Sequence, residues 1–388
     1  MDRDLRHRSR LRVVTLVDGI LPAGGGETLA HEIIARLDPE RFERTLCVSR
    51  WSPGSARQPE IAEALRRLDD AGVRFLGLER RSARDLRAWR PLLSLLRRER
   101  IDVLHAHKFG SNLWGAVLGT IARTPVVVAH EHTWSFVGQP MRRFLDRNLI
   151  ARNVDAFLTV SREDRRRMIE IERIPAEKLI FVPNGIPPLP PPSGRDVRRE
   201  LGIEPGAPVV GNVGSLRPQK ALDVLVRAAG VLADRVPGVR ILIVGEGEER
   251  GALERQIAEL GLEGTVTLLG YRPDVPDVLR GVDVAASSSD FEGTPLSILE
   301  YMEAGLPVVS TRVGGVPDLI EPAVHGQLVE RRDHLALADA IAELLGDRAR
   351  AEQMGRRARE RRRREFDIEV TVREVARIYE RLAGRITA

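Results

Sequence analysis

Cysteine is almost absent from this sequence. Only Cys47 occurs among 388 residues, so the chain cannot form an internal disulfide. The first strand-like run is not preceded by the charged, then apolar, then small-residue pattern of a signal peptide. We therefore do not expect a secreted, disulfide-stabilised protein, and we expect the chain to be cytoplasmic.

Long apolar runs are also missing. The longest nearly uncharged stretch, residues 110–122, contains Ser111 and Asn112. It is well short of the roughly 20 apolar residues that a membrane-spanning helix needs. We therefore expect no transmembrane segment. The length does allow sizeable cores, because it corresponds to roughly two to three domains of typical size.

Several catalytic motifs are absent as well. The sequence has no G-x-S-x-G elbow and no P-loop, and HEHTW at residues 130–134 is not the H-E-x-x-H zinc motif. The run VGEGEER at residues 244–250 begins like a dinucleotide-binding fingerprint, but Arg250 stands where the last glycine is required. A nicotinamide-dependent dehydrogenase is therefore not expected.

The net charge of +5 hides an asymmetry between the two halves of the chain. Residues 1–190 carry about +9 and residues 191–388 about −4. Basic residues gather at 80–100 and at 142–167, the first group with Trp89 and leucines interleaved. Three interpretations compete: a solvated helix face, attraction to an anionic membrane surface, and nucleic-acid binding. Nucleic acid is not expected as a partner, because no nucleic-acid module or aromatic stacking series accompanies the charge.

The pattern of the chain predicts an α/β protein built from two parallel sheets. Short β-branched runs alternate with helical segments in both halves, as in sheets covered by helices on both faces. Strands are expected at residues 12–18, 44–49, 73–78, 102–107, 126–130, 155–160 and 179–183, and then at 208–214, 239–245, 265–270, 282–287 and 307–311.

A proline-rich segment divides the two halves. Five prolines within residues 185–194 disfavour both helix and inner strand and predict an exposed linker. We expect one Rossmann-like domain over residues 1–187, a linker over 188–194 and a second such domain over 195–365. The remaining residues, 366–388, have a helical pattern.

Residues 287–315 carry the most informative chemistry. Thr294 as N-cap, Pro295 at the first helical position and Gly305 as the stop predict a helix over 295–304. The free N–H groups and positive dipole at its start suit a phosphate docked at Gly293 and Thr294. Two carboxylates, Glu292 and Glu300, flank that site, which matches the sugar, diphosphate and ribose of a nucleotide-sugar. The alternative is an amphipathic helix with two solvent-facing acids.

Two loops that follow strands add to this pattern. Arg217 and Lys220 lie at a strand-to-helix turn, at the carboxyl end of the sheet, where each can neutralise diphosphate charge. In the first half, the glycines at residues 24–26 follow the first strand. A plain turn needs at most one glycine, so three favour a close approach of the backbone to a phosphate.

Four of the eight histidines follow or end two strands, at positions 105, 107, 130 and 132. Members of each pair share a sheet face because they are two residues apart. A metal site is conceivable, but carboxylates at ligand spacing are missing apart from Glu131, which points to the opposite face. A neutral imidazole that hydrogen-bonds a sugar is the favoured interpretation, and a structural role is the alternative for His105 and His130.

Taken together, these segments resemble the retaining, nucleotide-sugar-dependent glycosyltransferases of the GT-B fold, in particular glycosyltransferase family 4. Glu292 and Glu300 match the E-x7-E signature of that family. The resemblance implies two Rossmann-like domains that face each other across a cleft, with a last helix that crosses back to the first domain. The other resembling segments are GGGET, DVLHAHKFGSNLWG, VVVAHEHTW, TVSRED, FVPNGI, VGSLRPQK, LIVGEGEERGALE, VTLLGYRPDV, GLPVV and GGVP.

The resemblance also implies roles for individual residues. The first domain would bind the acceptor and the second the donor. Two positions depart from the family pattern: Ser215 replaces a frequent arginine, for which Arg217 is our candidate replacement, and Tyr301 replaces an alanine. The implied catalytic residues are His132 at the donor sugar, Arg217 and Lys220 at the diphosphate and Glu292 at the sugar hydroxyls. The implied substrate-binding residues are Gly25 and Gly26 near the phosphates, His107 on the acceptor side, Tyr271 and Arg272 at the base, Gly293, Thr294, Pro295 and Leu296 at the phosphates and nucleoside, and Glu300 at the ribose.

The expected function is therefore retaining sugar transfer from a UDP- or GDP-linked donor to a lipid-linked or polysaccharide acceptor. No metal or other cofactor is expected. The basic first half suits a cytoplasmic enzyme that is peripheral at the inner face of the cell membrane, and a solvated helix face is the alternative interpretation of the same charge. A nucleotide-sugar epimerase of the same fold is one alternative, although it should show more acid and base residues in its first domain. A non-catalytic nucleotide-sugar-binding protein is the other, but such a protein is expected to have lost Lys220 or one of the two glutamates.

Overall fold

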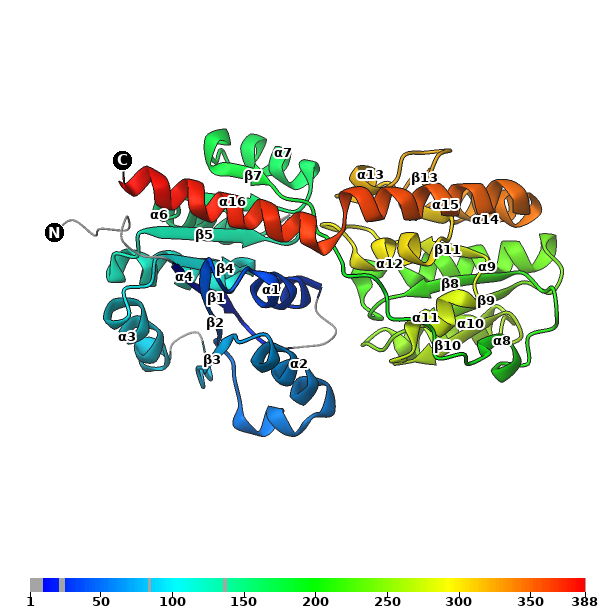
Figure 1. Ribbon diagram of the computed structural model, residues 1–388. Coiled ribbons are helices and arrows are strands. Elements are labelled where there is room, and N and C mark those ends of the chain that lie inside the picture. The colour runs from blue at the N-terminus through cyan, green and yellow to red at the C-terminus, as the bar shows by residue number, and fades with distance from the viewer. Residues whose placement is uncertain (1–9, 21–24, 83–84, 135–137, 388) are drawn as a thin grey trace. The chain divides into compact units, whose positions relative to one another are not determined.

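The computed structural model describes residues 10–20, 25–82, 85–134 and 138–387 (Figure 1). The chain forms two compact units. Unit 1 consists of Met1–Gly185 with Ile368–Ala388, and unit 2 of Ile186–Asp367. The chain therefore enters unit 2 at the first residues of the proline-rich segment and returns to unit 1 after Asp367.

Unit 1 is built on a seven-stranded parallel sheet in the order β3-β2-β1-β4-β5-β6-β7. The strands are β1 (Leu11–Val17), β2 (Phe42–Val48), β3 (Arg74–Gly77), β4 (Val103–His107), β5 (Val126–Glu131), β6 (Ala156–Thr159) and β7 (Leu179–Phe181). The helices are α1 (Gly25–Arg36), α2 (Pro59–Asp70), α3 (Arg90–Arg98), α4 (Lys108–Ala122), α5 (Pro140–Leu145), α6 (Ala151–Asn153), α7 (Arg162–Glu170) and α16 (Ile368–Thr387), with short 3₁₀ turns at Pro53–Arg57, Arg87–Trp89 and Ala176–Lys178 and a π-helical turn at Asp146–Ile150.

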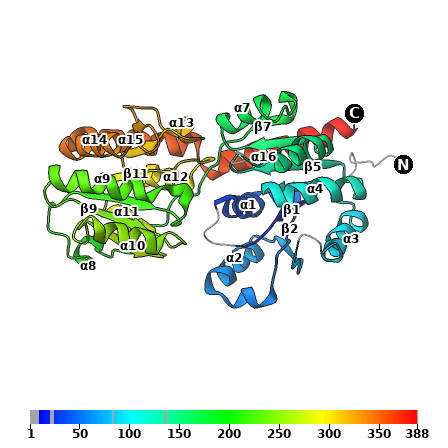
Figure 2. The same cartoon turned by 180° about the vertical axis from the view of Figure 1, so that it is seen from behind.

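Helices cover both faces of this sheet, so its central strands are buried on both sides. Val13 and Val17 of β1 pack in one core with α1 and α16. Val14 and Leu16 of the same strand pack in a second core with α3 and α4. Figure 2, in which the molecule is seen from behind, shows these two helices. The alternation along β1 thus divides its side chains between two helix layers.

The last helix, α16, belongs to the core of unit 1. Its Val375 and Tyr379 are fully buried, and the ring of Tyr379 meets that of Phe42 edge-on, with centroids 6.2 Å apart. The Thr371 hydroxyl also donates a hydrogen bond to the Pro183 carbonyl at 2.9 Å. The C-terminal segment is therefore an integral part of unit 1, although it is remote from the rest of that unit in sequence.

Unit 2 repeats the plan with a six-stranded parallel sheet in the order β10-β9-β8-β11-β12-β13. Its strands are β8 (Val209–Val213), β9 (Arg240–Val244), β10 (Val266–Gly270), β11 (Val284–Ser287), β12 (Val308–Thr311) and β13 (Gly326–Val329). Its helices are α8 (Val197–Glu200), α9 (Leu222–Arg235), α10 (Arg250–Glu259), α11 (Val275–Arg280), α12 (Leu296–Ala304), α13 (Val316–Leu319), α14 (His334–Gly346) and α15 (Arg348–Glu365), with a 3₁₀ turn at Pro218–Lys220.

The prediction of two Rossmann-like α/β domains is confirmed, and one strand was missed. Strand β13 lies at the edge of the sheet, and only Gly326 among its four residues is buried. A short edge strand that contains a glycine and a glutamine gives little hydrophobic signal, which explains the omission. Among the described residues, no helix combines the length and the apolar character that a membrane crossing requires.

Candidate active site

Helix α12 of unit 2 begins one residue later than predicted. Pro295, with φ −70° and ψ 118°, is the N-cap, and Leu296 is the first helical residue. The prediction of Thr294 as N-cap is therefore wrong: the extended ψ of Pro295 keeps that residue outside the helix. No side chain caps this end, so a ligand can still use the first-turn N–H groups. The predicted stop is confirmed, because Gly305 adopts the left-handed conformation with φ 77°.

Glu292 and Lys220 form the centre of the unit 2 site. Lys220 Nζ lies 2.6 Å from Glu292 Oε1, and Glu292 is only 6% exposed. Ser289 Oγ donates to the same carboxylate at 2.7 Å, and Gln219 Nε2 donates to it at 3.3 Å. From the family resemblance, Lys220 is expected at the diphosphate and Glu292 at the sugar hydroxyls. The structure instead pairs the two side chains directly and adds Ser289 and Gln219, for which the sequence gives no signal.

The loop before α12 depends on a glycine for its shape. Gly314 has φ 49°, and a Cβ there would lie 1.7 Å from the Glu292 carbonyl oxygen. The Gly315 N–H donates to the Gly293 carbonyl at 2.7 Å. Only glycine allows this approach, so the two-glycine segment after β12 determines where Glu292 and Gly293 lie.

Glu300 and Tyr301 lie on the first turns of α12. Burial raises the pKa of Glu300 to about 7, and the positive charge of Lys220 opposes that rise. The Tyr301 hydroxyl accepts a hydrogen bond from the Val213 N–H at 2.6 Å and lies 3.2 Å from the Val213 carbonyl oxygen. The tyrosine that replaces the usual alanine therefore ties α12 to the end of β8.

The other predicted residues of unit 2 have mixed surroundings. Arg217 is exposed at the start of the Pro218–Lys220 turn, and within the described ranges its side chain makes no ion pair. Tyr271 is 56% exposed. In contrast, the guanidinium of Arg272 lies 2.7 Å from Asp274 and 2.6 Å from Glu200, and these hydrogen bonds raise its pKa. Arg272 is thus already engaged by two carboxylates.

In unit 1, Gly26 near the start of α1 lies against Lys108 and His132. A Cβ on Gly26 would lie 2.8 Å from Lys108 Cε and 2.9 Å from His132 Cγ. Gly25 is exposed at the helix start, and Gly24 lies outside the described residues. Lys108 was not predicted; it follows β4 directly and forms an ion pair with Glu27.

The two histidines predicted for different sides of the site form one pair. His107 Nδ1 and His132 Nε2 are 3.0 Å apart, and both side chains are buried. The His132 ring stacks on that of His130, with centroids 4.4 Å apart. Burial lowers the pKa of both paired histidines well below the usual value, so the pair is neutral. One imidazole must donate and the other accept.

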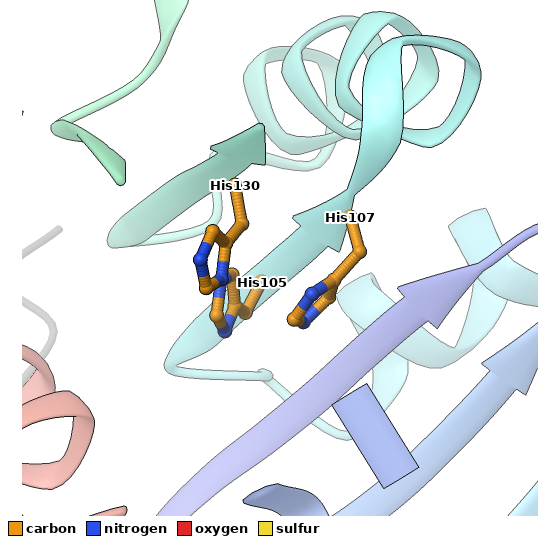
Figure 3. Close-up of side chains that lie close together, drawn as sticks. All are labelled: His105, His107 and His130. Carbon is orange, nitrogen blue, oxygen red and sulfur yellow. The ribbon is translucent and has the colours of Figure 1, made fainter. Parts of the chain in front are cut away.

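His105 and His130 complete a group of four buried imidazoles with His107 and His132. Figure 3 shows three of them, His105, His107 and His130. His105 Nδ1 lies 2.6 Å from the Tyr379 hydroxyl of α16. Burial lowers the pKa of His130 to about 3 and that of His105 well below its usual value. The group therefore carries no charge at neutral pH.

The opposite face of β5 adjoins a buried group of carboxyl side chains that sequence reasoning missed. Burial raises the pKa of Glu131 to about 8, that of Asp146 to about 9 and that of Glu172 to about 7. Trp134 Nε1 donates to Glu172 Oε1 at 2.8 Å. These acids lie on separate elements, and no motif in the sequence connects them.

Both units of the chain are similar to known proteins. Residues 194–361 match the family described as Glycosyl transferases group 1, and residues 23–188 match Glycosyltransferase Family 4. A D-inositol 3-phosphate glycosyltransferase of Nocardia farcinica is 33% identical over 278 residues, which cover 66% of this chain and 61% of that protein. A UDP-Gal:alpha-D-GlcNAc-diphosphoundecaprenol alpha-1,3-galactosyltransferase of Escherichia coli is 26% identical over 278 residues, which cover 68% of this chain and 72% of that protein.

A solved structure supports the fold. The Anabaena protein Alr3699/HepE in complex with UDP-glucose superposes with a TM-score of 0.82 at 23% identity, over 96% of this chain and 100% of that one. The two family matches together extend over most of the chain, one on each unit. The chain therefore belongs to the glycosyl transferases of group 1 and family 4.

Proposed function

We propose that this protein is a retaining glycosyltransferase that moves a hexosyl group from a UDP- or GDP-linked donor to a lipid-linked or polysaccharide acceptor. The observation that carries the proposal is the pair of Lys220 with the buried Glu292 beside the uncapped start of α12. A cation, a carboxylate and free helical N–H groups are what the diphosphate and sugar of such a donor require. The names of the Escherichia coli relative and of the Anabaena complex support a UDP-sugar.

In the proposed reaction the bond between the anomeric carbon and the diphosphate oxygen breaks first. Arg217, Lys220 and the start of α12 stabilise the negative charge that develops on the departing diphosphate. The acceptor hydroxyl then attacks the oxocarbenium-like carbon from the same face. Its proton passes to the departing phosphate oxygen, so the anomeric configuration is retained. This chemistry assigns no step to a metal ion.

The Lys220–Glu292 contact implies that donor binding separates the pair. The diphosphate takes Lys220, and Glu292 turns to the sugar hydroxyls while Ser289 continues to hold it. Glu300 accepts hydrogen bonds from the ribose, and His132 contacts the sugar. Exposed Tyr271 is available to the base, whereas Arg272 first has to leave its carboxylate partners.

A membrane surface fits the acceptor side of this proposal. In unit 1, Met141 and Phe144 are exposed on α5 beside Arg147, and Arg97 and Arg98 are exposed at the end of α3. Apolar side chains among cations suit an anionic bilayer at the cytoplasmic face. Co-sedimentation with anionic vesicles should fall with added salt; binding that ignores both lipid charge and salt contradicts this part of the proposal.

The central test measures donor recognition and turnover in the full chain. We expect UDP or GDP to raise the melting temperature, because a ligand that binds only the folded state stabilises it. A panel of nucleotide-sugars, with hydrolysis as the readout, then identifies the donor. Lys220→Ala and Arg217→Ala should each lower kcat as well as affinity, whereas Arg255→Ala, an exposed change on α10, should leave both unchanged.

Two results would contradict the proposal. The first is the lack of a thermal response to every nucleoside diphosphate. The second is unchanged turnover in both the Lys220 and the Arg217 variants. Formation of an epimer of the donor sugar, without transfer to any acceptor, would instead favour the epimerase alternative.

A further inference from the structure

The histidine group of unit 1 contains three side chains in an arrangement that suits a metal ion. β4 directs His105 and His107 to one face of the sheet, and the register of the parallel sheet sets His130 of β5 beside His107. One ring nitrogen from each of the three lies within 4.8 Å of the corresponding atoms of the other two. Figure 3 shows the three rings gathered on one side of the two strands.

His130 is the most unusual member of this group. It is 0% exposed, and neither of its ring nitrogens has a hydrogen-bond partner within the part of the chain that the structure describes. Buried polar atoms in folded proteins nearly always have such a partner. A histidine with two orphaned nitrogens in a core therefore needs an explanation, since a leucine or phenylalanine would fill the same space without that cost.

The other two histidines are held in a way that leaves one nitrogen free. His105 Nδ1 contacts the Tyr379 hydroxyl at 2.6 Å, and His107 Nδ1 contacts His132 Nε2 at 3.0 Å. The Nε2 atoms of His105 and His107 are buried and have no partner among the described residues. A proton on Nδ1 leaves the Nε2 lone pair free, and metal-binding histidines are typically oriented in this way by a second hydrogen bond.

We propose that His105, His107 and His130 form a binding site for a late first-row divalent metal ion, with Zn²⁺ as the natural occupant and water as the fourth ligand. Three neutral imidazoles suit zinc, whereas magnesium and calcium require oxygen ligands. Zinc–nitrogen bonds of about 2.0–2.1 Å put tetrahedral ligands roughly 3.4 Å apart. The three nitrogens, which lie within 4.8 Å of one another, therefore have to approach by up to about 1.4 Å, and the stacked rings of His105 and His130 have to turn out of parallel.

Such an ion would tie three elements of unit 1 together. It would join β4 to β5 directly and, through His105 and Tyr379, would hold α16 against them. With His107 Nε2 on the ion, Nδ1 carries the proton and donates to His132 Nε2. The site shares no residue with the Lys220 and Glu292 pair. It uses His107, which the family resemblance places on the acceptor side, as a metal ligand, and the binding of the ion does not depend on the proposed sugar transfer.

The test is metal uptake by the untagged full chain. The protein is stripped with a chelator, incubated with Zn²⁺ and separated from free metal by gel filtration. We expect about one zinc per chain, a higher melting temperature with zinc, and visible absorption typical of tetrahedral cobalt when Co²⁺ replaces zinc. His130→Leu should keep the fold and lose both the retained zinc and the cobalt spectrum. The matched control His334→Gln, in unit 2, should keep both.

Absence of retained zinc in the unaltered chain would overturn the proposal, and so would equal retention in His130→Leu. If that variant fails to fold, as circular dichroism would show, X-ray absorption of the zinc-loaded unaltered chain decides. Three imidazole ligands then support the site, and fewer than three, or oxygen and sulfur ligands, refute it. A failure to transfer sugar leaves these readouts unaffected.

Discussion

The two units have the same Rossmann-like plan but accommodate ionisable side chains in different ways. Around α12, unit 2 pairs opposite charges, as in Lys220 with Glu292 and Arg362 with Glu303. Around β5, unit 1 buries imidazoles and carboxyl groups that burial keeps neutral. A buried charge needs either a partner or a pKa shift, and each unit uses mainly one of these solutions.

The difference has a chemical meaning. The paired charges of unit 2 are ready to be redistributed onto a charged ligand, which suits a diphosphate donor. The neutral groups of unit 1 can exchange protons or hydrogen bonds without a large change in charge. We expect changes in unit 2 to act mainly through lost charge pairs or loop shape, with the buried Glu300 as the exception, and changes around β5 of unit 1 to act through pH.

The largest effect is expected at Gly314, the glycine that shapes the loop before α12. Gly314→Ala places a methyl group against the Glu292 carbonyl, which no side-chain rotation relieves, and should destabilise the protein by about 3–5 kcal/mol. Gly261→Ala is the matched control, because Gly261 has a similar φ of 65° but no atom within 4 Å. It should cost only about 1 kcal/mol. Urea unfolding measures both, and equal losses would show that backbone strain alone matters at Gly314.

Removal of one partner from the charge pair should have the next largest effect. Lys220→Met leaves Glu292 buried without its cation and should destabilise the fold by about 1–3 kcal/mol. The double variant with Glu292→Gln should recover part of this loss. Arg250→Met, which breaks exposed pairs with Glu246 and Glu254, should cost less than about 1 kcal/mol. Additive losses in the double variant would mean that the pair does not interact.

A smaller, pH-dependent effect is expected in unit 1. Burial raises the pKa of Asp146 from 3.8 to about 9, with Glu131 and Glu172 adding to the rise and Arg142 opposing it. The unfolded chain ionises this group above its ordinary pKa while the folded chain keeps it protonated, so its contribution to stability falls as pH rises from about 4 to 9. The effect of Asp146→Asn on the free energy of unfolding should therefore be more stabilising at pH 8 than at pH 5, by about 1–3 kcal/mol.

Urea unfolding at the two pH values measures this difference. Asp155→Asn is unsuitable as a control, because Asp155 accepts a backbone hydrogen bond from Val127. The exposed Asp339→Asn serves instead and should give the same difference in stability between pH 5 and pH 8 as the unaltered chain. If the free energy of unfolding of Asp146→Asn depends on pH as it does in the unaltered chain, Asp146 is not held protonated in the folded protein.

The smallest effect is expected at Glu300, which we propose contacts the ribose of the donor. Glu300, with a pKa of about 7, is ionised above that pH and then accepts hydrogen bonds more strongly. UDP affinity should therefore rise about three- to tenfold between pH 6 and pH 8, as calorimetry can measure. Glu300→Gln should abolish this dependence and Glu246→Gln should keep it. If the UDP affinity of Glu300→Gln still depends on pH, a group other than Glu300 causes the dependence.

Local signals in the sequence were sufficient for several features of the site. Gly305 stops α12 as predicted, because a glycine tolerates the left-handed conformation wherever it lies in the fold. The prediction of Thr294 as the N-cap of α12 is one position too early. The proline ring of Pro295 fixes φ but leaves ψ open, so the sequence does not show whether this residue is helical. Tyr301 gave no signal for its bonds to Val213, which is 88 residues away in sequence.

The sequence by itself determined the alternation of strands and helices, the division near the proline-rich segment and the carboxylates on either side of the start of α12. These features follow from local periodicity, backbone preferences and spacing along one helix. Only the tertiary structure decided that Lys220 meets Glu292, that His107 meets His132 and lies beside His130, and that Glu131 and Asp146 share a buried region. Such contacts depend on which strands become neighbours and in what register, and on the burial that results, and these are properties of the packed sheet.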